Sequence, residues 1–333
     1  MSRPSNRRGG EERHVRLVHR ATYTYPAPVT GSYGLGMLLP REGAGQRVHA
    51  ADLVVTPAPA EAADHLDLHG NRVSYFHVTE PHTTIEVCAT SVVSVARRRL
   101  DPAAALPVGW ERAAASVSGM RATGIGEHGE GPASVLAIVE SALPSELITP
   151  EESVREYAMP SFGPGTPLAH VVAGLSRRIR EDVDDAPPSR EGPAPLPEVL
   201  ARRAGSSHDR AHLLVACMRS MGLAARYVSG YVAPADDGAT EPHDAADDGA
   251  RQGPVAWASV WLPGGGWIHV DPTADRFIDN RYVILGWGRD HHDVAPLRGV
   301  VYGGGAGSSV RTEVRITPAA AHDLAAATRP ATT

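Results

Sequence analysis

The feature that most constrains this chain is a buried helix followed directly by strands in its second half. Apolar side chains at helical spacing predict one buried helix face, and these are Leu213, Leu214, Cys217, Met218 and Met221. Gly222 ends this helix, and residues 225–232 then have the pattern of a strand. The glycines at 264–266 join two more apolar runs, 255–262 and 267–271, into a hairpin. The apolar helix face is therefore expected to pack against the strands that follow it.

The same elements carry a specific motif. Residues 205–231 read GSSHDRAHLLVACMRSMGLAARYVSGY, and residues 256–273 read AWASVWLPGGGWIHVDPT. Together they closely resemble the core of the transglutaminase-like superfamily, a branch of the papain-like cysteine enzymes. In that family the first segment reads roughly G-x-C-x-D-x-A-H and then R-x-x-G-x-x-A-R-Y-V-x-G-Y, and the second reads H-A-W, a turn and W-x-x-x-D-P-T. By position, the family cysteine corresponds to Ser207, its histidine to Val255 and its aspartate to Asp271.

The resemblance implies acyl transfer or amide hydrolysis through a thioester, but two of the three positions lack the groups that this chemistry needs. A helix N-terminus and an imidazole stabilise a thiolate, and a carboxylate holds the imidazole in its working tautomer. The hydroxyl of Ser207 is far less acidic than a thiol, and Val255 accepts no proton. Asp271 is then left without a ring to orient. We expect a catalytically inactive protein that binds a peptide or protein partner in the former cleft.

Ser207 has two other interpretations. Ser206 or Ser207 can cap the helix, with Asp209 near its positive end. As a nucleophile, Ser207 would lack the G-x-S-x-G context of serine hydrolases. His208 would point away from it, because neighbouring helical residues do not face each other. A peptide hydrolase or amidase that uses Ser207 remains the alternative function.

A metal-dependent hydrolase is the second form of the alternative function. His208 and His212 are four residues apart and share a helix face, as in H-E-x-x-H enzymes. His269 and Asp271 are the nearby candidates for a third ligand. The family pattern also has a histidine at position 212, so no metal or other cofactor is expected. The tract 291–293 (HHD) is expected in a surface or closing loop.

Other conspicuous side chains have structural interpretations. Cys217 lies about 15 Å along the helix from Ser207 and on its apolar stripe, so it is expected to be buried and inert. Asp271 precedes a proline in a turn, where a carboxylate can accept backbone amides. Arg226 and Tyr227 are expected to set the packing of the strand behind the helix. The side chains expected to line the cleft are His208, Asp209, His212, Trp257 and Trp267.

Composition narrows the partner and the compartment. With 333 residues, of which 42% are hydrophobic and 21% charged, the chain is typical of a soluble globular protein of about two domains. A formal net charge of -6 disfavours nucleic acid as a partner. No apolar run or signal-peptide core indicates membrane association. Cys88 and Cys217 indicate reduced thiols in a cytoplasmic protein, and nothing indicates the oligomeric state.

The first part of the chain predicts antiparallel strands, the clearest being 19–25 (HRATYTY) and 85–95 (IEVCATSVVSV). It resembles the N-terminal domain that precedes many bacterial transglutaminase cores. The implied fold class is α+β, an antiparallel β-rich domain followed by a papain-like, transglutaminase-like core. The expected division is a disordered tail (1–13), the N-terminal β domain (14–100), a connector with short helices (101–165), the core (166–316) and a second disordered tail (317–333). The core opens with an amphipathic helix at 166–182.

Overall fold

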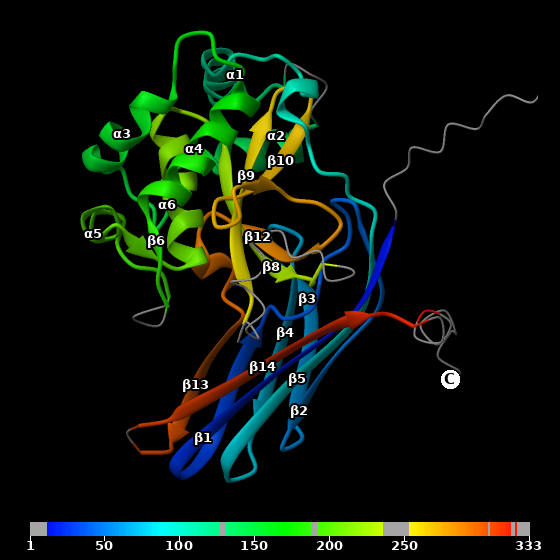
Figure 1. Ribbon diagram of the computed structural model, residues 1–333. Coiled ribbons are helices and arrows are strands. Elements are labelled where there is room, and N and C mark those ends of the chain that lie inside the picture. The colour runs from blue at the N-terminus through cyan, green and yellow to red at the C-terminus, as the bar shows by residue number, and fades with distance from the viewer. Residues whose placement is uncertain are drawn as a thin grey trace, which may run out of the picture.

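The computed structural model describes residues 12–126, 131–187, 192–235, 253–305, 307–320 and 324. An antiparallel β-rich region precedes a sheet covered by helices, which confirms the α+β class. Figure 1 shows the helices gathered at one end and the long strands of the first sheet at the other. The two expected disordered tails fall largely outside the described residues. Within these ranges no helix is long and apolar enough to cross a bilayer.

The first sheet is organised around one long strand, β1 (Arg13–Gly36). Its path order is β2-β5-β1-β4-β3, and β13 and β14 also pair with β1. Alternate β1 residues such as Val15, Leu17 and Ala21 are buried, as expected for a strand with one covered face. The other strands are β2 (Gln46–Thr56), β3 (Glu61–Leu66), β4 (Arg72–Val78), β5 (His82–Val95), β13 (Leu297–Gly303) and β14 (Ser309–Pro318).

Two strands from the end of the chain complete this first sheet. β14 runs antiparallel to β1 from the pair Val15 and Pro318 to the pair Thr24 and Ser309. β13 pairs with the second half of β1. The expected core range 166–316 therefore includes two strands that belong to the N-terminal sheet.

The second sheet has the order β11-β10-β9-β8-β12 and carries α6 on one face. The predicted helix, strand and hairpin are all present as neighbours in this layer. Their bounds are α6 (Ser207–Ser220), β8 (Ala225–Val232), β9 (Val255–Leu262), β10 (Gly266–Asp271), β11 (Arg276–Phe277) and β12 (Tyr282–Gly288). The two faces of this sheet have different environments, and the residue register assigns each side chain to one of them.

Helices bury the α6 face of the second sheet. The predicted amphipathic helix is α4, and its apolar stripe is fully buried, as expected: Leu168, Val171, Val172, Leu175 and Ile179. It packs in one core with the apolar side of α6. The helices other than α6 are α1 (Trp110–Thr123), α2 (Pro132–Glu140), α3 (Glu152–Ala158), α4 (Leu168–Asp182) and α5 (Leu196–Arg202). The short elements are β6 (Asp184–Asp185), β7 (Ala204–Gly205), η1 (Pro102–Ala104), η2 (Met159–Ser161) and η3 (His291–Val294).

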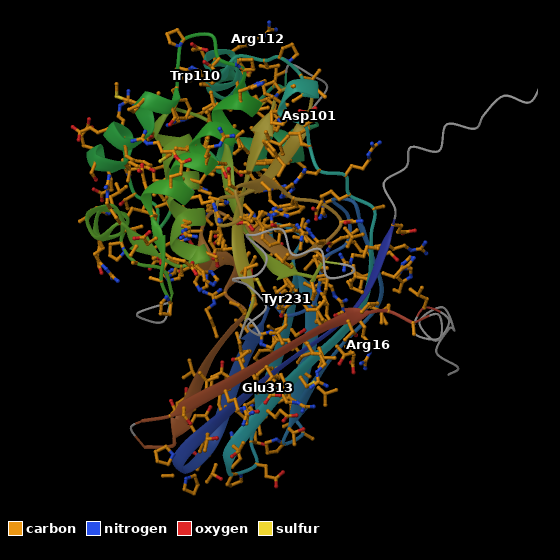
Figure 2. The ribbon with its side chains drawn as sticks, in the orientation of Figure 1. Arg16, Asp101, Trp110, Arg112, Tyr231 and Glu313 are labelled. Carbon is orange, nitrogen blue, oxygen red and sulfur yellow. The ribbon has the colours of Figure 1, made fainter. Side chains whose placement is uncertain are left out.

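Amide side chains from the first region hold β12 as a neighbouring strand would. Gln46 donates to the carbonyl of Ile284 at 2.7 Å and accepts its N–H at 2.9 Å. Asn71 does the same with Trp287, at 2.8 and 3.0 Å. Tyr231 lies where the two sheets meet (Figure 2), with its hydroxyl 2.5 Å from Nδ1 of His19. These contacts fix the orientation of the core sheet on the β-rich region.

Candidate functional site

The N-terminus of α6 is capped by Ser206, and Ser207 is the first helical residue. Asp209 accepts from the Ser206 amide and hydroxyl, both at 2.8 Å, and from the amide of Ala194 at 2.6 Å. A Cβ at Gly205 would lie 2.8 Å from that of Asp209, so this close packing requires glycine. Asp209 is therefore part of a capping box rather than an open cleft. Ser207 takes no part in the cap.

Val255 begins β9 inside an apolar cluster. It is buried with Val228, Trp257, Ile278, Tyr282 and Ile284. Val255 is paired with Gly230 and Trp257 with Val228, so both side chains lie on the face of the sheet opposite Tyr227. Trp257 is completely buried, so it is part of the core and not a cleft wall.

Asp271 ends β10 with its carboxylate fully engaged by the protein. Oδ1 accepts the amides of Thr273 at 2.8 Å and Ala274 at 3.3 Å, as the turn motif predicts. Oδ2 accepts the hydroxyl of Tyr282 at 2.9 Å. Burial, followed by the charge of Asp271, raises the pKa of Tyr282 well above its usual value, so the phenol stays a proton donor. The partner of this aspartate is thus a phenol that belongs to the same apolar cluster as Val255.

The first turns of α6 contribute to a polar cluster centred on Tyr227, which the sequence interpretation missed. Nδ1 of His208 lies 2.5 Å from the Tyr227 hydroxyl, and Nδ1 of His291 lies 3.3 Å from it. Nε2 of His212 accepts the backbone amide of His291 at 3.1 Å. Residues 291–293, which were expected in a surface or closing loop, thus form the start of η3. His291 packs edge-on against His208, with ring centroids 5.4 Å apart. The alternation of side chains along β8 could have indicated this cluster, because it directs the side chain of residue 227 towards α6.

Burial keeps these imidazoles neutral. Desolvation lowers the pKa of His208, and it lowers that of His212 well below the ordinary value with help from the charges of His291 and His208. The pKa of His291 is lowered to about 4 by burial and by the charges of His208 and His292. A general base works best with a pKa near the working pH. These rings are therefore poorly matched to taking a proton at neutral pH.

The candidates for a third metal ligand lie on the other side of the sheet. His269 is paired with Ser259, and Ser259 with Arg226, so His269 shares a face with Arg226. Asp271 has the same parity as His269 along β10, while His208 and His212 face Tyr227. Among the residues that the structure describes, no group of three or more His, Cys, Asp or Glu side chains could hold a metal ion.

Cys217 is buried as the sequence predicts, whereas Cys88 is less buried than Cys217. Cys217 is completely buried, and that burial raises the pKa of its thiol. Cys88 is partly buried in β5, and both thiols are free.

Of the five side chains expected to line the cleft, Trp267 lines a pocket of about 850 Å³, on the sheet face opposite α6.

Comparisons with known proteins agree with these observations. The model of the family described as "Bacterial transglutaminase-like N-terminal region" matches residues 15–94. The model described as "Transglutaminase-like superfamily" matches residues 163–272, a range that includes Ser207, Val255 and Asp271.

Relatives match over nearly the whole chain. The chain is 37% identical over 314 residues to the uncharacterized protein Rv2569c of Mycobacterium tuberculosis (strain ATCC 25618 / H37Rv), covering 91% of this chain and 92% of the relative. It is 29% identical over 292 residues to the uncharacterized protein ML0607 of Mycobacterium leprae (strain TN), covering 88% and 94%. A solved structure from Cytophaga hutchinsonii, described as a candidate cysteine protease, superposes with a TM-score of 0.68 at 19% identity, covering 93% of this chain and 91% of that one. At this identity the likeness is one of fold.

Proposed function

Because this chain belongs to the transglutaminase-like superfamily, we propose that it is a catalytically inactive member that binds a peptide or protein partner near the N-terminus of α6. The observation that carries the proposal is the hydrogen bond from Tyr282 to Asp271 at 2.9 Å. In the family arrangement this carboxylate would orient an imidazole. Here a buried phenol takes that place, and Val255 packs against the same tyrosine.

The surroundings of Ser207 support the absence of acyl transfer. A serine nucleophile needs a base that takes its proton. The neighbouring rings of His208 and His291 are already engaged with Tyr227, and their pKa values are lowered. The retained helix end and strands would then present a binding surface. We place this role in the cytoplasm, on the basis of the free thiols of Cys88 and Cys217.

Turnover is the first test. The full chain is incubated with a panel of peptide amides and peptide esters, with and without an amine acceptor, and products are measured by mass spectrometry. The expected result is no hydrolysis or transamidation above the rate in buffer. The Ser207→Ala variant is expected to behave identically. Turnover that disappears in this variant would contradict the proposal.

A second test asks whether the family geometry survives under altered side chains. The double variant Ser207→Cys/Val255→His is compared with Ser207→Cys alone for alkylation by iodoacetamide at neutral pH. The side chain at 255 lies on the face of the sheet opposite Tyr227, in the cluster of Trp257 and Tyr282, so the two variants are expected to react at equal rates. An imidazole beside a thiol raises its thiolate fraction, so a double variant that reacts about 10-fold faster would mean that positions 207 and 255 form one site.

Binding is tested with the two ends of α6 as a matched pair. Peptides selected from an array by the native chain are titrated against Ser207→Trp and against Ser220→Trp, which carries the same bulk at the other end of the helix. The proposal expects affinity to be lost in the first variant and kept in the second. Retention in both variants, or failure of the native chain to select any peptide, would count against a partner site here.

A serine hydrolase is the second candidate, and one observation favours it. Ser206 supplies the helix cap, and the side chain of Ser207 makes no hydrogen bond to any described part of the chain. A fluorophosphonate probe labels activated serines. Labelling of the native chain that is lost in Ser207→Ala would establish this function, and metal analysis of the purified protein would test the form that uses His208 and His212.

A further inference from the structure

A second polar site lies on the face of the core sheet that α6 does not cover. The pocket of about 850 Å³ is formed between α2, the end of β5 and the strands β8, β10 and β12. The residues that line it include Arg226 and His269, together with Trp267 and Trp287. Arg97 and Glu140 also line it.

Two indole rings pack against the guanidinium of Arg226 in this pocket. Its guanidinium carbon lies 3.8 Å from the ring centroid of Trp267 and 3.7 Å from that of Trp287. The residue is only 7% exposed, and its buried Nε has no hydrogen-bond partner. Across all the residues with described positions, Arg226 makes no side-chain hydrogen bond or ion pair.

Two neighbouring arginines differ from Arg226 because they donate hydrogen bonds, although the buried Nε of Arg41 also has no partner. Arg41 stacks on the Trp287 ring, 3.1 Å from its centroid, and donates to the Asn71 side chain at 2.8 Å. Arg97 donates to the carbonyl of Tyr282 at 2.8 Å. The residue paired with Arg226 across the sheet is Ser259, whose buried hydroxyl also has no partner. Arg41 and Arg97 thus donate hydrogen bonds to the protein, whereas the guanidinium of Arg226, which lines the pocket, donates none to the described residues.

The charges around the pocket have one dominant sign. Burial, and then the charge of Arg41, lowers the pKa of Arg226. Burial and the charges of Arg226, Arg97 and Arg41 lower the pKa of His269. The carboxylate of Glu140 is already close to other cations, 3.9 Å from His69 and 3.7 Å from Arg289. A buried cation without a counter-charge is destabilising, and an anion that entered the pocket would relieve this.

We propose that this pocket binds the carboxylate of an organic acid with an apolar body, and that Arg226 is its anchor. Only the edge of a guanidinium stacked between two rings is free, and this edge presents parallel N–H donors that match a carboxylate. The pocket also exposes Ala133, Leu136 and Ala137 of α2, which suit a hydrocarbon portion. Glu140 disfavours a doubly charged phosphate more than a singly charged carboxylate. The site is separate from Ser207 and does not depend on the function proposed above.

The first experiment uses the native full chain. Tryptophan fluorescence and calorimetry follow titration with 3-phenylpropionate, its neutral amide 3-phenylpropionamide, and inorganic phosphate. The acid is expected to perturb the emission of the flanking indoles and to bind at least 10-fold more tightly than the amide or phosphate. Short peptides with a free or an amidated C-terminus then distinguish a peptide end from a free acid. Equal affinity for acid and amide, or tighter binding of phosphate, would overturn the proposal.

Variants identify the anchor. Arg226→Met keeps the apolar stem between the indoles but removes the charge, and Ser259→Glu places a competing carboxylate on the paired position of β9. Both are expected to weaken 3-phenylpropionate binding at least 10-fold. Arg20→Met, at an exposed arginine that pairs with Glu86, is the matched control and keeps native affinity. Unchanged binding in a folded Arg226→Met protein refutes the assignment, and if that variant does not fold, Ser259→Glu and the acid–amide comparison decide it.

Ser207→Ala separates this proposal from the preceding one. It is expected to bind 3-phenylpropionate with native affinity, because Ser207 heads α6 and does not line the pocket. Loss of binding in Ser207→Ala with retention in Arg226→Met would move the carboxylate site to the α6 side of the sheet.

Discussion

The two faces of the core sheet treat polar groups in opposite ways. On the α6 face, His208, His212 and His291 are linked to one another through the Tyr227 hydroxyl and a backbone amide. On the other face, Arg226 is 7% exposed and stacks on two indole rings, and it makes no side-chain hydrogen bond or ion pair to the described residues. The polar groups on the α6 face are therefore satisfied by one another, and the unpartnered guanidinium lies on the opposite face, which also carries Val255 and Asp271.

This difference follows from the chemistry of the two side chains. An imidazole that is buried can lose its proton, so a cluster of histidines can become neutral and act as a set of donors and acceptors. A guanidinium stays charged in proteins, so it needs an anion or a set of acceptors. Asp271 lies on the same face as Arg226, but its carboxylate oxygens already have hydrogen-bond partners within the protein. The predictions that follow test this distinction, beginning with the largest expected effect.

Removing the Asp271 carboxylate is expected to be the most damaging change. Asp271→Ala would leave the buried Tyr282 hydroxyl and the turn amides of Thr273 and Ala274 without their acceptor. We expect the free energy of unfolding to fall by about 3 kcal/mol, measured by urea denaturation. Asp271→Asn keeps an acceptor for the amides and should lose less. A native-like stability for Asp271→Ala would show that the carboxylate is retained for a purpose other than structure.

Loss of the Tyr227 hydroxyl, which joins the histidine cluster, is expected to have the second largest effect on stability. Tyr227→Phe removes the hydroxyl that lies 2.5 Å from Nδ1 of His208, in a completely buried position. The expected loss is about 2 kcal/mol, because a buried ring nitrogen is left without its partner. Urea denaturation measures it, and Tyr33→Phe, at an exposed residue of β1, serves as the control. No difference between the two variants would mean that the cluster is not internally satisfied.

Acid should destabilise the cluster in a defined direction. The pKa of His291 in the folded chain is about 4, below its ordinary value of 6.5. Between these two values the unfolded chain binds a proton that the folded chain does not. The contribution of the neutral His291 ring to stability is therefore fully present above pH 6.5 and decreases as the pH falls through this window. The contribution of this one group is about 1.4 kcal/mol per pH unit. Urea denaturation at pH 7, 6 and 5 should show a shallower decline for His291→Gln, whereas parallel curves would contradict a neutral buried ring.

Much of the fold follows from patterns that are local in the sequence. The apolar stripes of α4 and α6 and the hairpin of β9 and β10 depend on helical or alternating spacing, and the structure contains all of them. The position of β14 does not depend on such spacing. A short alternating strand does not specify its partner, and in this fold the partner is β1, at the opposite end of the chain. Pairing over such a separation is determined by the whole fold and not by nearby residues.

The same limit applies to the candidate site. The capping role of Ser206 and the turn at Asp271 could be predicted because their partners lie within three residues. The contact of His291 with Tyr227, and that of Trp287 with Arg226, join segments that are adjacent only after the sheet has formed. Strand parity already separates Arg226 from Tyr227, so the sequence could have shown that they face opposite sides. It could not have shown what each of them meets there.

The smallest predicted effect has the opposite sign to the others. Arg226→Met removes a buried charge that has no counter-ion, at the expense of two cation–π contacts worth about 1 kcal/mol each. Because the desolvation penalty of an unpaired buried cation exceeds these contacts, the free energy of unfolding is expected to rise by about 1 kcal/mol. Thermal and urea denaturation without ligand measure it, with Arg20→Met as the neutral control. A loss of stability would instead mean that the indoles and the guanidinium form a structural unit, and the contrast between the two faces would then disappear.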